Sequence, residues 1–299
     1  MRCPATEGRS VTIKLRGDGE VTSSRGSKAP GRGSCADADP PSDVAAASTH
    51  AADLQADRSI IGKIPAKNHR AERERAYTPP AMIHLGCSGF PVPATRYLKE
   101  FKSVEVADTL LGVPGPALVR RWRREAPEGF LFTAIAPKEV SADGFKPSAE
   151  GQAAWEAFLP VVRDLDARAI IVTSAADMTA SKLHRASARA YFEALPRDRL
   201  PPLVWEAPAS WEFRDAEATV KDLSVVVARD PLRHPPIAKG ALGCFRLPGP
   251  AGFKSRYEDP ALEAAAATIR ASRCDVLLVV LCNVDMYADA KRLRKLLDL

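Results

Sequence analysis

Three charged side chains interrupt runs of residues that are otherwise apolar and strand-like. Glu105 lies in "SVEVADT", Glu206 in "PLVWEA" and Arg246 in "LGCFRLPG". Two carboxylates can serve one reaction as acid and base, and a guanidinium can hold an anionic group of a ligand. Because a carboxylate inside a protein is costly unless it is paired, we expect Arg246 to contact Glu105 or Glu206. Three roles stay open for the set: a structural ion pair, an anchor for an anionic or hydroxylated ligand, and a general acid–base pair.

These charges can meet only if the ends of distant strands converge. From Met82 onward, short Val/Ile/Leu-rich runs alternate with amphipathic stretches, which predicts strands alternating with helices. Eight strand-like runs occur, and a helical pattern follows seven of them; after "SVVVARD" comes the Pro-rich "PLRHPPIAKGA", which cannot form a regular helix. The count predicts an α/β fold, a compact TIM-like (β/α)8 barrel. A doubly wound open sheet is the alternative, but "GCSGF" is too short for its usual Gly-rich phosphate turn.

Residues 1–81 differ from residues 82–299 in composition. They contain a single aromatic residue, Tyr77, while the rest of the chain holds the other 18. Such a segment cannot bury enough apolar surface to offset its chain entropy, so we expect a disordered N-terminal extension. Two interpretations stay open: a genuine disordered tail, or upstream sequence translated ahead of a true start at Met82. The first twenty residues lack the apolar stretch of a secretory signal.

Charge and cysteine content indicate which kinds of partner and which cellular compartment to expect. The formal net charge of +6 divides into +3 for residues 1–81 and +3 for residues 82–299, so a nucleic-acid partner is not favoured. The six cysteines form no CxxC pair, which predicts reduced thiols and a cytoplasmic location. No run of 18 apolar residues occurs, so we expect no membrane span.

Six short motifs resemble the YecE-like family, domain of unknown function 72. In chain order they are "GCSGF", "VEVADTLLGVP", "PEGFLFTAIAPKEVS", "VWEAPASW", "FRLPG" and "VVLCN". Each match is weak alone, but together they keep the family's order across essentially all of residues 82–299. The resemblance implies a TIM-like barrel and no established activity. It also implies that Glu105 and Thr109 face the barrel interior.

The resemblance carries a set of candidate site residues at the strand ends. Glu206 and Glu105 are the expected catalytic residues, and Lys138, just past the third strand, is positioned to replace a family lysine that is Ile135 here. The expected substrate-binding residues are Ser88, Thr109, Lys138, Arg246 and Asn283. Several other polar or aromatic family positions hold apolar residues or cysteine in this chain: Ala107, Leu110, Leu111, Pro248 and Cys282.

The sequence supports metal, thiol or phosphate chemistry less than it supports chemistry by the two glutamates. No histidine falls at the end of a predicted strand, so we expect no metal and no other cofactor; the three in residues 82–299 are His84, His184 and His234. Cys87 and Cys282 end strands without an activating neighbour in the sequence, and we interpret both as apolar fillers. The basic stretch "VRRWRRE" is interpreted as a solvated helix face rather than a phosphate site.

The expected function is that of a metal-independent hydrolase or lyase, which acts on a small polar or phosphorylated substrate at the barrel mouth. One alternative is a non-catalytic ligand-binding barrel that has lost the family's polar site, and a further one is a nucleic-acid-processing protein. Whether the chain is an enzyme therefore stays open. The sequence predicts neither the substrate nor the oligomeric state.

Overall fold

The computed structural model describes residues 81–299, in which strands and helices alternate along the chain. The eight strands are β1 (Met82–Cys87), β2 (Ser103–Val106), β3 (Leu131–Ile135), β4 (Ile170–Thr173), β5 (Leu203–Glu206), β6 (Val225–Val227), β7 (Leu242–Leu247) and β8 (Val276–Leu281). The α-helices of these residues are α2 (Ala94–Glu100), α3 (Pro116–Glu125), α4 (Ala149–Leu165), α5 (Lys182–Ala194), α6 (Phe213–Thr219), α7 (Asp259–Ala271) and α8 (Met286–Leu296). A helix follows every strand except β6, as the Pro-rich stretch after that strand predicts. The interpretation of residues 1–81 falls almost wholly outside the described residues.

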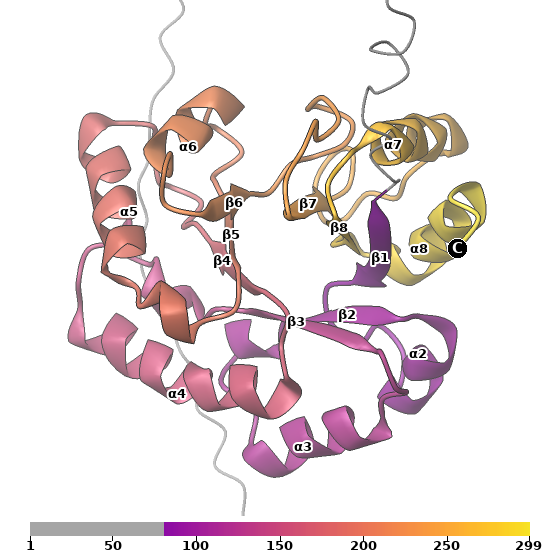
Figure 1. The fold of residues 1–299 in the computed structure, drawn as a ribbon, viewed down its shortest axis with the longest axis horizontal. Coiled ribbons are helices and arrows are strands. Elements are labelled where there is room, and N and C mark those ends of the chain that lie inside the picture. Colours follow the sequence, from indigo (N-terminus) through magenta and orange to yellow (C-terminus); the bar gives the residue numbers. More distant parts are fainter. Residues whose placement is uncertain (1–80) are drawn as a thin grey trace, which may run out of the picture. The chain divides into compact units, whose positions relative to one another are not determined.

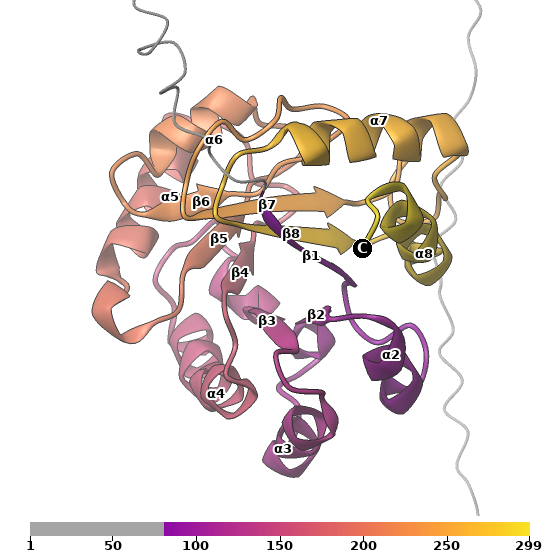
Figure 2. The same cartoon turned by 45° about the vertical axis from the view of Figure 1, so that its right-hand side comes forward.

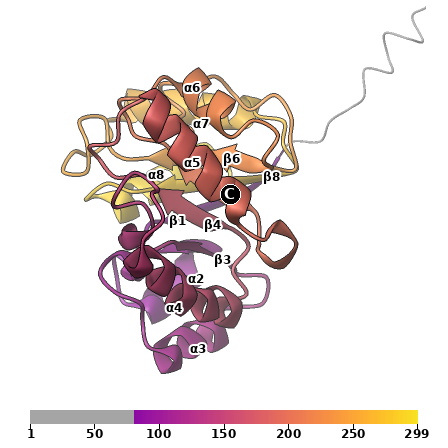
Figure 3. The ribbon, with the colours of Figure 1, turned by 90° about the vertical axis from the view of Figure 1, so that its left-hand side faces the viewer.

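The strands form a cylinder with the helices around it (Figure 1). All the strand pairs are parallel, in one sheet of order β1-β8-β7 and one of order β2-β3-β4-β5-β6. Figure 2 shows the three strands of the smaller sheet side by side beneath α7, and Figure 3 shows α5 on the outer side of the strands. A single parallel bridge joins the sheets at each junction. We call the β1–β2 junction, with the bridge Ser88–Glu105, the first seam, and the β6–β7 junction, with the bridge Arg229–Phe245, the second seam.

The first seam depends on a glycine. A Cβ atom at Gly86 of β1 would lie 2.4 Å from the carbonyl oxygen of Ser103 in β2, far inside van der Waals contact. The missing side chain therefore lets the backbones of β1 and β2 approach at the place where the smaller sheet meets the larger one.

Apolar side chains fill both faces of the strands, as expected for a parallel sheet under helices. The larger cluster lies between the strands and the helices and includes Val104, Phe132 and Trp205. A smaller cluster lies inside the cylinder; its buried members are Leu131, Ile135, Ala169, Ile171, Val204, Cys244 and Leu278. This two-sided burial explains why the strands appear in the sequence as continuous apolar runs.

The stretch "DPALEAAAATIRAS" predicts a helix capped by Asp259, and "SVEVADT" predicts a strand that extends to Thr109; both predicted boundaries are wrong. Asp259 does not cap α7: it is the first helical residue, Glu258 precedes it, and its carboxylate pairs with the guanidinium of Arg292. The second strand ends at Val106, before a 3-10 turn at Asp108–Leu110, so Thr109 lies beyond the strand. In contrast, the helical pattern that starts at Ser148 in the sequence predicts the beginning of α4 correctly, because the Ser148 hydroxyl accepts a hydrogen bond from the backbone amide of Gly151 at 3.0 Å.

The prediction of a TIM-like α/β barrel is confirmed by this element order. The candidate residues at the carboxyl ends of the strands therefore gather at one end of the cylinder. None of the helices in residues 81–299 has the length and apolar character needed to span a membrane.

Candidate functional site

Glu105, Glu206 and Arg246 meet at the carboxyl end of the barrel, and we call them the charged triad. Arg246 of β7 donates through Nε to Glu206 Oε1 of β5 at 3.0 Å and through a terminal nitrogen to Glu105 Oε2 of β2. The predicted contact of Arg246 with Glu105 or Glu206 is confirmed, and the structure shows that the arginine contacts both carboxylates. One guanidinium thus bridges two acidic groups.

The triad joins the two sheets. Arg246 belongs to the smaller sheet and both glutamates to the larger one, so each ion pair links one sheet to the other. Ser88 adds a contact across the first seam, since its hydroxyl donates to Glu105 Oε1 at 2.7 Å. The interactions that form the candidate site therefore also hold the cylinder closed.

The three charges differ in their access to solvent. The Glu105 side chain is fully buried and that of Arg246 is 7% exposed, whereas the Glu206 side chain is 33% exposed. Burial raises the pKa of Glu105, and the charge of Arg246 and the hydrogen bond from Ser88 oppose that rise. With both carboxylates ionised, the triad has one negative charge, and Glu206 is the acidic group that a ligand can reach.

We expect replacement of Glu105 by glutamine to change how stability depends on pH. Because the pKa of Glu105 is higher in the folded than in the unfolded protein, its stabilising contribution is present below the ordinary pKa and is lost as pH rises through the folded value. Relative to the wild type, Glu105→Gln should therefore gain stability as pH increases. Urea unfolding of both proteins between about pH 4 and pH 8 measures this trend. A stability difference that stays constant, or moves the other way, contradicts the assignment.

Three other predicted site residues lie outside the triad's network. The Thr109 hydroxyl donates to the backbone oxygen of Ile135 at 2.5 Å and so ties the turn after β2 to β3. The buried amide of Asn283 donates to Ser255 O at 2.9 Å and to Asp289 Oδ2 at 2.8 Å, which fixes the loop before α7. Lys138 is exposed on the 3-10 turn after β3, and nothing in the described residues connects it to the triad.

Sequence reasoning missed Thr133 of β3. This residue is in register with Glu105, is 2% exposed, and its hydroxyl has no hydrogen-bond partner among the described residues. The only signal in the sequence is one polar residue inside the apolar run "FLFTAIAP". A buried hydroxyl with unused hydrogen-bonding capacity thus lies on the strand beside the triad.

The cysteines at the strand ends behave as fillers. Burial raises the pKa of the Cys87 thiol to about 12, and the thiol lies 3.5 Å from the backbone oxygen of Met286, the first residue of α8. Burial also raises the pKa of the Cys282 thiol, although Arg246 opposes that rise. Both groups stay protonated at neutral pH, so neither is an activated nucleophile.

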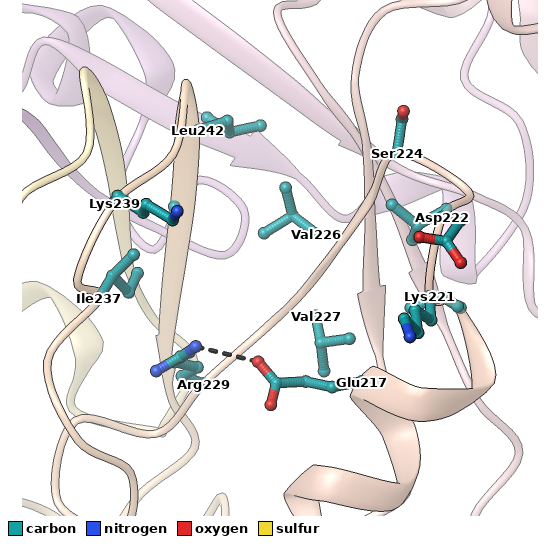
Figure 4. A pocket seen from close by; sticks show the side chains of 13 residues that line it. Glu217, Lys221, Asp222, Ser224, Val226, Val227, Arg229, Ile237, Lys239 and Leu242 are labelled. Atoms are coloured by element: carbon teal, nitrogen blue, oxygen red, sulfur yellow. Dashed lines mark hydrogen bonds and ion pairs between the residues drawn. The ribbon is translucent and has the colours of Figure 1, made fainter.

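A hollow of about 300 Å³ lies beside the second seam, where β6 and β7 diverge (Figure 4). The Arg229 guanidinium donates to Glu217 of α6 and to the Pro235 oxygen of the Pro-rich loop, each at 3.1 Å, and it also lies over the Phe213 ring. These contacts brace the part of the wall that lacks a covering helix. We therefore assign this cluster of charges to the fold.

Within residues 81–299, no group of three or more histidine, cysteine, aspartate or glutamate side chains is arranged to hold a metal ion.

Comparisons with known proteins identify relatives of the barrel. A family profile described as "Protein of unknown function DUF72" matches residues 94–299. A DUF72 family protein from Enterococcus faecalis V583 is 18% identical with a TM-score of 0.57, over 73% of this chain and 96% of that one. One from Thermotoga maritima MSB8 is 17% identical with a TM-score of 0.56, over 73% and 100%. A D-psicose 3-epimerase structure, determined in the presence of D-fructose, is 16% identical with a TM-score of 0.51, over 71% and 96%. No curated protein matches the chain.

Proposed function

This chain is a member of the DUF72 family, the YecE-like proteins, and from that premise we propose that its barrel mouth binds a small, uncharged, polyhydroxylated molecule. Glu206 is the side chain that meets the ligand. Ser88, Glu105 and Arg246 hold that carboxylate in place. The observation that carries the proposal is the charge of the triad, in which one arginine already pairs with two carboxylates.

The charge balance disfavours phosphorylated ligands. Arg246 donates hydrogen bonds to Glu105 and Glu206. Because these two carboxylates already balance its charge, it offers little positive charge to a phosphate group. A carboxylate that is one-third exposed instead accepts hydrogen bonds from hydroxyl groups. A sugar-like ligand is also in keeping with the epimerase of similar fold that was crystallised with D-fructose, although that likeness concerns the fold alone.

Hydrolase or lyase chemistry would then use Glu206 as the single general base. Glu105 is fully buried, accepts a hydrogen bond from Ser88 and pairs with Arg246. It therefore helps to position Glu206 through Arg246 rather than acting as a second catalytic carboxyl. The same burial favours the second candidate, a non-catalytic barrel that binds the ligand without transforming it. Both candidates need the same ligand contact at Glu206, so binding is tested first.

Thermal unfolding of the full chain with added ligand tests the proposal. D-fructose and myo-inositol serve as neutral hydroxylated probes, and glycerol 3-phosphate as a phosphorylated one. A bound probe at about ten times its Kd adds about 1.4 kcal/mol and raises Tm by a few degrees. We expect at least one neutral probe to stabilise the wild type and to lose that effect in Glu206→Gln.

Glu217→Gln is the matched control. Glu217 also pairs with one arginine at a partly exposed site, but it lies on α6 and its partner is Arg229 rather than Arg246. This variant should keep the full ligand effect. Stabilisation by the phosphorylated probe alone, or an undiminished effect in Glu206→Gln, would contradict the proposal. Salt-sensitive retention of DNA or RNA would favour a nucleic-acid function instead.

A further inference from the structure

The amino end of the barrel, opposite the charged triad, contains a cavity of about 800 Å³. Its apolar lining comes from strand beginnings and from the loops that lead into them, including Phe130, Leu131, Leu242, Val276 and Leu278. A volume of this size lies within the range of small-molecule sites. The amino end of such barrels is ordinarily a packed, stabilising face, so a cavity there must be explained by the residues that form it.

Small side chains leave this end of the barrel unfilled. Ala169, directly before β4, belongs to the cluster inside the cylinder, a position where bulky branched residues usually fill a TIM barrel. Ala167, Ala241 and Pro202 add further small groups at the cavity wall. The hollow therefore follows from the residue types at these positions.

The charged groups that face the cavity are mostly cationic. Arg123 of α3 is held by a hydrogen bond of 3.1 Å to the Phe130 oxygen and lies over the Phe132 ring, 5.2 Å from its centre. No carboxylate among residues 81–299 pairs with it, so most of its five N–H donors stay available. Arg168 and Asp166 form an exposed ion pair at 3.4 Å that is largely neutral as a unit.

His84 lies on the β1 side of the cavity. Burial and the charge of Lys102 lower the pKa of its imidazole, so this group is neutral at pH 7. The site thus combines an apolar cavity with one fixed, unneutralised guanidinium. The basic stretch "VRRWRRE" on α3 is expected to be a solvated helix face. This expectation does not hold for Arg123, which lines the cavity.

We propose that this cavity binds an amphiphilic organic anion, with the apolar body against Leu131, Leu242 and Leu278 and the anionic group on Arg123. A planar guanidinium pairs with a carboxylate through two parallel hydrogen bonds, and the Phe132 ring holds it in position. The site is independent of the function proposed for the barrel mouth, because it uses none of the triad residues.

Titration calorimetry of the full chain tests this site. Decanoate is the anionic probe and decyltrimethylammonium the cationic probe with a similar apolar chain, both kept below their critical micelle concentrations. We expect decanoate to bind at least about tenfold more tightly than the cation, which corresponds to about 1.4 kcal/mol. Arg123→Gln should weaken decanoate binding by about tenfold.

Two further variants complete the test. Arg124→Gln removes the neighbouring exposed arginine of α3 that does not line the cavity, and it should bind decanoate like the wild type. Ala241→Phe places a large ring at the exposed rim of the cavity and should weaken binding of both probes. Equal affinity for the two probes, no binding of decanoate, or equal affinities of the two arginine variants would overturn the proposal.

Discussion

Replacing Arg246 by methionine is expected to destabilise the protein by about 3–5 kcal/mol. The change leaves Glu105 fully buried without its cation and removes both ion pairs that link the two sheets. An uncompensated buried charge is far more costly than the loss of a surface pair, so the effect should exceed that of other arginine substitutions. Urea unfolding at neutral pH measures it as a lower midpoint.

Arg121→Met is the matched control for this variant. Arg121 also pairs with a glutamate, but on the exposed face of α3, and its loss should leave the midpoint nearly unchanged. Combining Arg246→Met with Glu105→Gln and Glu206→Gln should recover part of the stability, because no carboxylate then lacks its cation. If Arg246→Met unfolds like Arg121→Met, the triad does not hold the sheets together.

Gly86→Ala is expected to cost roughly 1–3 kcal/mol or more. The added Cβ would meet the carbonyl oxygen of Ser103 at 2.4 Å, and backbone of a buried strand cannot move aside as a flexible side chain can. Relief would require β1 and β2 to separate at the first seam, next to the hydrogen bond from Ser88 to Glu105. A lower unfolding midpoint with an unchanged denaturant slope is the expected readout.

Gly115→Ala provides the comparison for the glycine. A Cβ at Gly115, just before α3, would meet no atom within 4 Å, so its stability should change by no more than about 0.5 kcal/mol. Equal midpoints for the two alanine variants would show that the first seam tolerates a wider separation of its strands.

Local signals explain why the order of elements could be predicted. Apolar runs such as "DVLLVVLCN" and the cap at Ser148 act over a few residues, and they identify strands and helices before any tertiary contact forms. The Pro-rich stretch after β6 equally excludes a helix by local geometry. Predicted helix boundaries were wrong where a tertiary contact involves the capping residue. The Asp259 carboxylate, for example, pairs with Arg292 instead of capping the helix.

The candidate site was only partly predictable. Glu105, Glu206 and Arg246 stand out because a charge inside an apolar run needs a partner, and that argument led to the observed contact. The roles of Thr109 and Asn283 could not be obtained in this way. Each bonds to a backbone oxygen far along the chain, Thr109 to Ile135 O and Asn283 to Ser255 O, and only the folded structure brings these groups together.

The sequence alone predicted that this protein is a barrel of alternating strands and helices, and that Arg246 contacts Glu105 or Glu206 within it. Tertiary structure decided that one arginine serves two carboxylates, that these pairs link two sheets, and that the opposite end is hollow. The physical reason is the distance along the chain over which each signal acts. Periodicity and capping are fixed by neighbouring residues, whereas barrel closure and cavity volume depend on register and side-chain size summed over eight strands.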